Sequence, residues 1–408
     1  MKKLSFPKSK IKVLLLEKLD KSAKDIFLKE GYNVETYDGS LSEEELISKI
    51  KNVSILGIRS KTYISKKVID SADRLLSIGA FCIGTNQINL EECEIAGITV
   101  FNAPYSNTRS VVEIVIGQII NLMRCIVEKS NDLHEGTWRK DSINSYEIRN
   151  KIIGIIGYGN IGSQLSVICE SLGMRVIYYD IVDKLSIGNA KKHETLESLL
   201  KVSDIISLHV DGRLENTNLI GKREIELMKK NSILINYSRG NIVDTKALKE
   251  NLLNNKLMGA AIDVFPKEPL NNKEKFESSL KGIKNLILSP HIGGSTKEAQ
   301  KNIGSYVPDK IIDFVNTGDT SNCVNFPELS LPEQRDSHRL IHIHRNESGV
   351  LLEINKIISS FNINIKGQYL KTLENIGYVI TDIDREYNKD VVKKLKNISQ
   401  TIRLRVLY

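Results

Sequence analysis

Three charged or titratable side chains follow apolar runs in the second half of the sequence. Arg239 follows "SILINYS", Glu268 follows "LMGAAIDVF" and His291 ends "LILSPH". A guanidinium can bind a carboxylate with two hydrogen bonds, and an imidazole that titrates near neutrality can accept a proton. A carboxylate beside the imidazole would hold the ring and raise its pKa. This set of groups suits the removal of a proton and a hydride from a 2-hydroxy acid.

A glycine cluster indicates what accepts the hydride. The run "IIGIIGYGNIG" places Gly157, Gly159 and Gly162 between a strand-like and a helix-like segment, and Asp180 ends the next apolar run. This spacing allows a tight turn, a close approach of backbone to a pyrophosphate, and close packing of the helix, whose N-terminus favours phosphate. Asp180 would accept hydrogen bonds from both ribose hydroxyls and repel a 2′-phosphate. We therefore predict that the cofactor is NAD rather than NADP.

Parallel β-α-β units are expected to position these groups. Short apolar runs alternate with amphipathic stretches such as "SEEELISKIKN" in the first hundred residues, and the alternation resumes at Lys151 with runs that are apolar on both faces. The carboxyl ends of parallel strands share one edge, where such sheets bind ligands. The strands that we expect lie within 12–17, 33–38, 53–60, 75–81, 98–104, 151–157, 175–180, 204–210, 232–238, 257–265 and 286–291.

A long helix is predicted between the two regions. Ser110 and Glu113 have the spacing of a capping box, and the apolar run "SVVEIVIGQIINLMRCIVEKSND" follows. We expect this helix to be buried and to cross between two domains.

The C-terminal residues indicate a separate small domain. The segment from Thr317 to Asp336 contains two prolines and several polar residues, which is typical of a linker. After it, "HRLIHIH", "SGVLLEINKIISSF", "NIKGQYL", "GYVITDI", "DVVKKLKNI" and "IRLRVLY" give the order β-α-β-β-α-β. This is the ferredoxin-like order.

Composition excludes several other classes. The net charge of +8 comes from lysines that are spread along the chain among acids, without a basic block, so we expect no nucleic-acid partner. No apolar run approaches about 18 residues, so no membrane span is expected. The five scattered cysteines form no C-x-x-C pair, which favours reduced thiols, a cytoplasmic location and no metal site.

At these residues the chain resembles the D-2-hydroxyacid dehydrogenase family, and specifically its bacterial members with a C-terminal ACT regulatory domain. The resemblance extends from about Ile11 to Tyr408 and rests on "IRSKT", "FCIGTNQ", "FNAPYSNTRSVVE", "GIIGYGNIG", "INYSRG", "AAIDVFPKEP", "PHIGGST" and "HIHRNESGVL". It implies an α/β fold with two Rossmann-like, doubly wound parallel-sheet domains and a ferredoxin-like ACT domain. The implied parts are a substrate-binding domain (1–109), an NAD-binding domain (110–295), a return segment to the first domain (296–326), a linker (327–337) and the ACT domain (338–408).

The resemblance also implies roles for individual residues. Arg239, Glu268 and His291 match the catalytic residues of the family. Arg59, Ser60 and Asn107 match its substrate loops. The implied cofactor-binding residues are Gly157, Gly159, Asn160, Ile161, Gly162, Asp180, Tyr237, Ser238, Arg239, Asp263, His291, Ile292, Gly293 and Gly294.

The chain departs from the family at two positions beside the cofactor. The family usually has a small residue at Tyr237 and a proline at Asp211.

The ACT domain implies regulation. Asn346 and Asn364 match residues that bind L-serine across a dimer interface in bacterial relatives. Arg345 and Ser348 depart from the commonest pattern of that loop. The resemblance implies oxidation of 3-phospho-D-glycerate to 3-phosphohydroxypyruvate by a homotetramer, at the first step of L-serine synthesis and under feedback by L-serine.

Two alternatives stay open on sequence alone. One is a dehydrogenase for glyoxylate, hydroxypyruvate or 2-hydroxyglutarate. The other is an NAD(H)-sensing protein that acts as a corepressor, which retention of the three catalytic residues does not exclude. The ACT domain favours the biosynthetic enzyme, because an entry step benefits from control by its end product.

Overall fold

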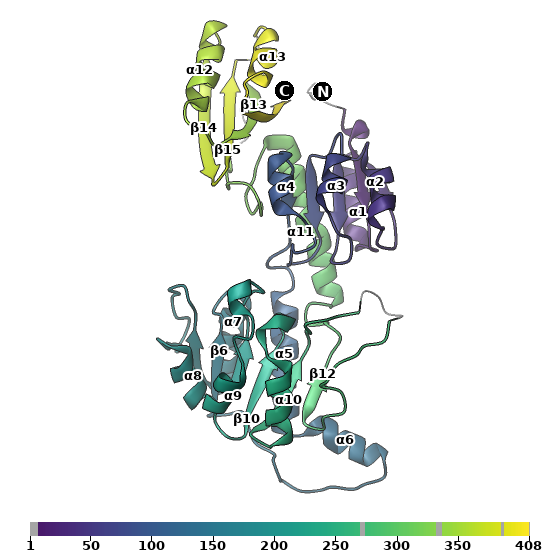
Figure 1. The fold of residues 1–408 in the computed structure, drawn as a ribbon, viewed down its shortest axis with the longest axis vertical. Coiled ribbons are helices and arrows are strands. Elements are labelled where there is room, and N and C mark those ends of the chain that lie inside the picture. Colours follow the sequence, from purple (N-terminus) through teal and green to yellow (C-terminus); the bar gives the residue numbers. More distant parts are fainter. Residues whose placement is uncertain (1–6, 270–273, 332–336, 385–386, 408) are drawn as a thin grey trace. The chain divides into compact units, whose positions relative to one another are not determined.

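The structure is a computed structural model that describes residues 7–269, 274–331, 337–384 and 387–407. Its contacts divide the chain into two units. The first unit contains residues 1–106 and 300–408, and the second contains residues 107–299. Figure 1 shows the helices and strands of both units with their labels.

The first unit begins with a five-stranded parallel sheet in the order β2-β1-β3-β4-β5. Strands β1, β3 and β4 bury almost every side chain, as a sheet with both faces covered requires. The strands are β1 (Lys12–Leu15), β2 (Asn33–Thr36), β3 (Ile55–Ile58), β4 (Ser77–Ala80) and β5 (Thr99–Phe101). The helices among them are η1 (Lys8–Lys10), α1 (Lys21–Lys29), α2 (Glu43–Ile50), α3 (Lys66–Asp70) and α4 (Leu90–Ile95).

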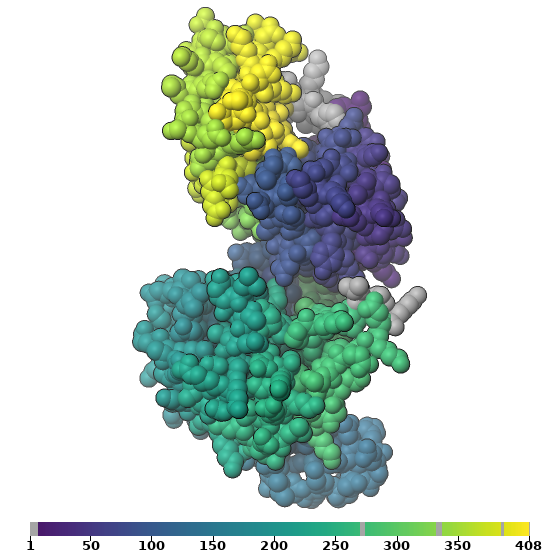
Figure 2. Space-filling view, in the orientation of Figure 1, coloured from purple at the N-terminus to yellow at the C-terminus, as the bar shows by residue number. Residues whose placement is uncertain are grey.

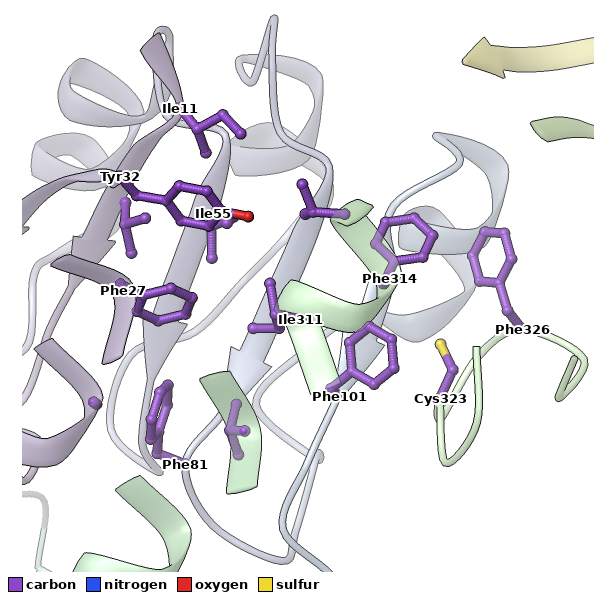
Figure 3. Close-up of a cluster of buried hydrophobic side chains, with 14 of the residues drawn as sticks. Ile11, Phe27, Tyr32, Ile55, Phe81, Phe101, Ile311, Phe314, Cys323 and Phe326 are labelled. Atoms are coloured by element: carbon purple, nitrogen blue, oxygen red, sulfur yellow. The ribbon is translucent and has the colours of Figure 1, made fainter. Parts of the chain in front are cut away.

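Helix α11 (Lys297–Thr317) completes the core of this sheet. Its Ile311 and Phe314 pack with Phe27 and Phe101 in one buried cluster (Figure 3). Each of these four side chains is at most 1% exposed. The segment that returns after the second unit is therefore part of the hydrophobic core of the first.

The second unit has a seven-stranded parallel sheet in the order β12-β11-β10-β9-β6-β7-β8. The order reverses beside β6, so the edge there is a topological switch point of the kind that binds dinucleotides. The strands are β6 (Ile152–Ile156), β7 (Arg175–Tyr179), β8 (Lys191–Lys192), β9 (Ile205–Leu208), β10 (Ser232–Asn236), β11 (Leu257–Ile262) and β12 (Leu286–Leu288). The helices are α5 (Thr108–Met123), α6 (Ile126–His134), α7 (Asn160–Ser171), α8 (Leu196–Val202), η2 (Leu214–Asn216), α9 (Lys222–Leu227), η3 (Gly240–Ile242) and α10 (Thr245–Leu253).

The long helix predicted from Ser110 differs from the observed structure in two ways. It begins at Thr108 without a side-chain cap, because the Ser110 hydroxyl bonds to Thr296 (2.8 Å) and Glu113 pairs with Arg109. The capping-box prediction was therefore wrong. The helix also breaks at Cys125, whose φ of 50° is left-handed, and α6 continues at 65° to α5.

Within the described residues, no single helix has the length and apolar character to cross a membrane. Within those residues, helices α5 and α6 reach that length and apolar character only when they are taken together, and they meet at a bend of 65°.

The C-terminal sheet belongs to the first unit and has the predicted order β-α-β-β-α-β. Its antiparallel strands lie in the order β14-β15-β13-β16, with α12 (Val350–Ser360) and α13 (Asp390–Lys396). The strands are β13 (His338–Arg345), β14 (Ile365–Leu373), β15 (Ile376–Ile383) and β16 (Thr401–Leu407). The α/β fold class with a small antiparallel C-terminal domain is thus confirmed.

The predicted linker (327–337) lies only partly within the described residues, because 332–336 fall outside them. In the described part, Leu329 and Leu331 pack on the core of the first unit, and Pro327 accepts a hydrogen bond from Thr320 (2.7 Å). Those residues are therefore built into the unit. Composition missed this because two leucines were sufficient to anchor an otherwise polar segment.

Candidate active site

The glycine turn between β6 and α7 has the shape that a pyrophosphate needs. Gly157 has a φ of +91°, which side-chain-bearing residues rarely adopt. A Cβ at Gly162 would lie 2.1 Å from the Gly157 carbonyl oxygen, so only glycine lets the helix pack there. Gly159 has open space where a Cβ would be, and no side chain caps α7. The free N–H groups at this helix N-terminus, beside Asn160 and Ile161, thus fit the phosphates of a dinucleotide.

Asp180 follows β7 at the same edge. Its Oδ2 accepts a hydrogen bond from the Tyr158 N–H (2.7 Å) and its Oδ1 accepts one from the Val182 N–H (2.9 Å). These bonds hold the carboxylate beside the glycine turn. Each oxygen keeps a second lone pair, so the group can still accept hydrogen bonds from ribose hydroxyls.

The loops after β11 and β12 bring Glu268 and His291 together. The Nδ1 of His291 lies 2.8 Å from Oε2 of Glu268, whose other oxygen accepts a hydrogen bond from the Phe265 N–H (3.1 Å). His291 has a left-handed φ of 55°, and its N–H bonds to the Asp263 carbonyl oxygen (2.8 Å). A strained backbone held in this way is characteristic of functional sites. Because Nδ1 is engaged, Nε2 is the nitrogen that can exchange a proton with a substrate.

The pair shifts both pKa values in the directions that stabilise the ion pair. The hydrogen bond to Glu268 raises the pKa of His291, and the negative charges of Glu268 and Asp263 add to this against the opposing effect of burial. Burial acts to raise the pKa of Glu268, but the hydrogen bond and charge of His291 outweigh it, and the pKa is lowered. The histidine therefore holds a proton to higher pH than an ordinary imidazole does.

Arg239 follows β10 on a loop fixed by close backbone contacts. Its Nη1 donates to the Ser238 carbonyl oxygen (2.8 Å), and its own carbonyl oxygen accepts a hydrogen bond from the Asn236 side chain (3.0 Å). A Cβ at Gly240 would lie 2.0 Å from the Phe265 carbonyl carbon. This glycine thus lets the arginine loop and the loop that carries Glu268 approach each other. The charge of Arg239 also acts on the pKa values of both Glu268 and His291.

Asp263 lies beneath the histidine loop and is 1% exposed. Its carboxylate accepts hydrogen bonds from the Ser289 hydroxyl (2.6 Å), the Ile292 N–H (2.9 Å) and the Gly293 N–H (2.7 Å). Both oxygens are therefore used to shape residues 291–294. In this structure Asp263 positions the loop that the sequence assigned to the cofactor.

Tyr237 occupies space beside the same loop. The side chain is buried, its hydroxyl lies 3.0 Å from the Ser289 hydroxyl, and burial raises its pKa. A Cβ at Gly293 would lie 3.0 Å from its ring. The large residue is thus accommodated by packing inward, next to Ser238, whose hydroxyl donates to Asn236 (2.8 Å).

Asp211, at the other unusual position, organises the loop after β9. It forms an ion pair with Arg213, and this hydrogen bond is the main cause of its lowered pKa. The neighbouring Gly212 lies against Arg239, since a Cβ there would be 3.1 Å from Cγ of that arginine. Asp211 therefore forms an ion pair within this loop, and Gly212 is the residue that lies against the arginine.

The predicted substrate residues are divided between the two units. Asn107 directly precedes α5 in the second unit, and its side chain lies so close to Gly294 that a Cβ there would be 2.1 Å from Nδ2. Its buried Oδ1 has no hydrogen-bond partner among the described residues. Arg59 and Ser60 follow β3 in the first unit, with Arg59 half-buried and Ser60 exposed.

The two asparagines of the C-terminal domain lie at opposite ends of its sheet. Asn346 follows the end of β13 that pairs Arg345 with Ile376, and its side chain donates to the Glu374 carbonyl oxygen (2.9 Å). Asn364 precedes the end of β14 that pairs Ile365 with Ile383. The eight residues of β15 separate them, about 25 Å at the usual rise of a strand. One chain therefore does not bring these two side chains into one site.

Sequence reasoning missed two residues that bind the loop containing Arg59. Glu17 and Gln87 are buried and form hydrogen bonds with that loop. The signal for Glu17 was a carboxylate directly after a buried strand, and Gln87 lies inside a motif already recognised. Both side chains bind backbone groups of the loop, which the sequence pattern alone does not show.

Comparison with known proteins agrees with this geometry. Residues 116–293 match the NAD-binding domain of the D-isomer-specific 2-hydroxyacid dehydrogenases, and residues 340–403 match an ACT domain like that of the acetohydroxyacid synthase small subunit. The chain is 48% identical to proteins named D-3-phosphoglycerate dehydrogenase from Dictyostelium discoideum (99% of each chain) and Escherichia coli K12 (100% of each chain).

A solved structure supports the same assignment. The match is with a D-lactate dehydrogenase from Aquifex aeolicus, complexed with NAD and lactic acid. It spans 78% of this chain and 100% of that chain, with a TM-score of 0.68 and 25% sequence identity. The chain is thus an NAD-dependent oxidoreductase that acts on CH–OH groups, and it belongs to the D-isomer-specific 2-hydroxyacid dehydrogenase family.

Proposed function

We propose that this chain oxidises 3-phospho-D-glycerate to 3-phosphohydroxypyruvate with NAD, at the first step of L-serine synthesis. The observation that carries the proposal is the pairing of His291 with Glu268 at the edge where the glycine turn and Arg239 also lie. Proteins named D-3-phosphoglycerate dehydrogenase match the chain over its full length, which supports this choice of substrate.

In this proposal each side chain has one task. Arg239 holds the substrate carboxylate through its guanidinium. Nε2 of His291 accepts the hydroxyl proton as the C–O bond becomes a carbonyl, and Glu268 stabilises the imidazolium that forms. Bound NAD supplies the acceptor for the hydride that leaves carbon 2. Arg59, Ser60 and Asn107 are the proposed contacts for the rest of the substrate.

The proposed binding of NAD involves the glycine turn, Asp180 and residues 291–294. The N–H groups of α7 would hold the pyrophosphate, and Asp180 would hold the ribose and disfavour a 2′-phosphate. Asp263 and Tyr237 would act indirectly, by fixing the 291–294 loop.

We further propose a cytoplasmic homotetramer inhibited by L-serine. Asn346 and Asn364 lie at opposite ends of β15, so a site made from both needs a second copy of the chain. The amide groups of two asparagines can bind both the carboxylate and the ammonium of an amino acid. Strand β14 is an edge of its sheet, with Tyr369, Leu370 and Leu373 exposed, which suits pairing with another copy.

Helix α6 and the loop after it offer a second surface for assembly. Figure 2 shows this segment, coloured blue, standing out from the surface of its unit. Several apolar side chains are exposed on it: Ile126, Val127, Leu133, Trp138 and Ile143. Apolar surface of this kind is typical of protein interfaces.

Initial rates of NADH formation test the proposed substrate. The wild type should oxidise 3-phospho-D-glycerate with a kcat/KM that exceeds those for glycerate, D-lactate and 2-hydroxyglutarate. An enzyme that prefers one of the other acids would be a different dehydrogenase of this family. NADH binding without turnover of any of them would favour the corepressor-like alternative.

A further inference from the structure

The carboxylate of Glu17 binds the backbone of the loop that carries Arg59 and Ser60. We call residues 59–62 the substrate loop. Oε1 of Glu17 accepts hydrogen bonds from the N–H groups of Arg59 (3.2 Å) and Thr62 (2.9 Å), and Oε2 accepts one from the N–H of Lys61 (3.1 Å). One carboxylate thus satisfies three backbone donors that follow the end of β3.

The backbone at Glu17 is itself unusual. Glu17 and Lys18 have left-handed φ values of 64° and 48°, and Glu17 is only 8% exposed although it is charged. The Glu17 N–H bonds to the Gly39 carbonyl oxygen (2.9 Å), which fixes this conformation. Side-chain-bearing residues adopt such a conformation at a cost, and strained positions cluster at functional sites.

Gln87 holds the same loop through its other backbone group. Its Nε2 donates to the Arg59 carbonyl oxygen (2.6 Å), and the side chain is 7% exposed. Both the N–H and the C=O of Arg59 are therefore bound by buried side chains. Arg59 directly follows Ile58, the last residue of β3. The direction of the chain at Arg59 therefore depends on the hydrogen bonds from Glu17 and Gln87.

The charge of Glu17 argues that its role is geometric. A buried carboxylate beneath a loop that binds an anion weakens the attraction of the loop for that anion. Its benefit must therefore come from the three N–H groups that it satisfies and orients. In the proposed reaction the substrate carboxylate goes to Arg239, so the phosphate is the anion left for Arg59.

We propose that Glu17 is a positioning residue that sets the substrate loop for the phosphate of the substrate. This inference rests on the proposed function, because it assigns the phosphate to Arg59. Glu17 does not touch the substrate and acts through the backbone of Arg59, Lys61 and Thr62.

The decisive variant is Glu17→Gln, which keeps the size of the side chain. A glutamine amide has one acceptor oxygen, and its NH₂ group would face backbone donors, so the three bonds cannot all form. The KM for 3-phospho-D-glycerate should rise about tenfold or more, while kcat stays within about twofold and the KM for NAD is unchanged. A lower KM for 3-phospho-D-glycerate would show that the charge matters more than the geometry, and an unchanged KM would show no positioning role. Either result overturns the proposal.

Two further variants of the same support strengthen the test. Gln87→Ala should show the same rise in the KM for 3-phospho-D-glycerate at nearly constant kcat. If Glu17→Gln does not fold, Glu17→Asp takes its place, because its shorter carboxylate withdraws from the loop and should raise the same KM. A parallel fall of kcat, NADH affinity and Tm in these variants would mean a merely structural role and would overturn the proposal.

Asn325→Ala is the matched control. Asn325 is buried in the same unit, where its side chain bonds the Val100 N–H (2.8 Å) and the Ile98 carbonyl oxygen (2.9 Å). Its loss should lower Tm and leave the KM for 3-phospho-D-glycerate unchanged. A KM rise as large as in Glu17→Gln would show that general destabilisation explains both, and would overturn the proposal.

Arg59→Ala separates this inference from the proposed function. A raised KM in Arg59→Ala with an unchanged KM in Glu17→Gln would overturn the positioning role alone. An unchanged KM in Arg59→Ala would remove the substrate role of the loop, and both proposals for these residues would fall.

Discussion

Replacing Glu268 by glutamine removes the charge that faces His291 and keeps the size of the side chain. The hydrogen bond to Glu268 is the largest cause of the raised pKa of His291, so this pKa should fall in the variant. Oxidation of the substrate needs the neutral imidazole, so the acid limb of the pH–rate profile for oxidation should move to lower pH. Reduction needs the imidazolium, so its alkaline limb should also move to lower pH.

The expected loss in rate follows from the geometry of the pair. A hydrogen bond to a charged group contributes about 1.5–3 kcal/mol. The lower end applies here, because the side chains of His291 and Glu268 are 52% and 35% exposed and water screens them. On the pH-independent plateau of the profile in each direction, kcat should therefore fall about tenfold, which corresponds to about 1.4 kcal/mol.

The assay measures initial rates in both directions across the pH range, with Glu277→Gln as control. Glu277 lies on the surface, 76% exposed, where it pairs with Lys281. The control should leave both limbs in place. Limbs that stay unmoved in Glu268→Gln, or that move to higher pH, would refute the assigned role of Glu268.

The remaining predictions concern stability, the cofactor and regulation. The difference in Tm between the wild type and Glu268→Gln should be largest at pH values between the pKa of Glu268 and the pKa of His291 in the folded protein. The stability that His291 contributes is lost as pH rises through its raised pKa, and the stability that Glu268 contributes is lost as pH falls through its lowered pKa. Thermal melts across the pH range measure this difference. Gly162→Ala should lower Tm and abolish NADH binding in a fluorescence titration, since its Cβ would lie 2.1 Å from a carbonyl oxygen. Asp180→Ala should narrow the ratio of kcat/KM for NAD over NADP at least tenfold (about 1.4 kcal/mol), and an unchanged ratio would assign the choice to another residue. Asn346→Ala should raise the L-serine concentration needed for half-inhibition and leave the uninhibited kcat unchanged; a wild type insensitive to millimolar L-serine would contradict the regulatory proposal.

The sequence predicted the sheets well because local patterns determine them. Every strand expected from an apolar run is present, and the glycine turn, Asp180 and His291 all follow strand ends. Parallel strands that are covered on both faces require continuous apolar runs, so the signal is strong. Among the strands of the described residues, only the two-residue strand β8 had no apolar run to indicate it.

Features that depend on tertiary contacts were harder to predict. The hydroxyl of Ser110 is bound by Thr296, which is 186 residues away, so its capping pattern was misleading. The helix breaks at Cys125, which adopts a left-handed conformation. No glycine or proline beside it in the sequence indicates a break there. Asp263 and Glu17 bind backbone groups of distant loops, and no local pattern encodes such partners.

The transfer of hydrogen from carbon 2 of the substrate tests the central claim most directly. 3-Phospho-D-glycerate labelled with deuterium at carbon 2 is incubated with the wild type and NAD, and the reduced cofactor is analysed by mass spectrometry. The account predicts one deuterium in each NADH, formed in equal amount to 3-phosphohydroxypyruvate, and a rate that falls by about two to four orders of magnitude in His291→Ala. Unlabelled NADH, no NADH, or an undiminished rate in His291→Ala would contradict it.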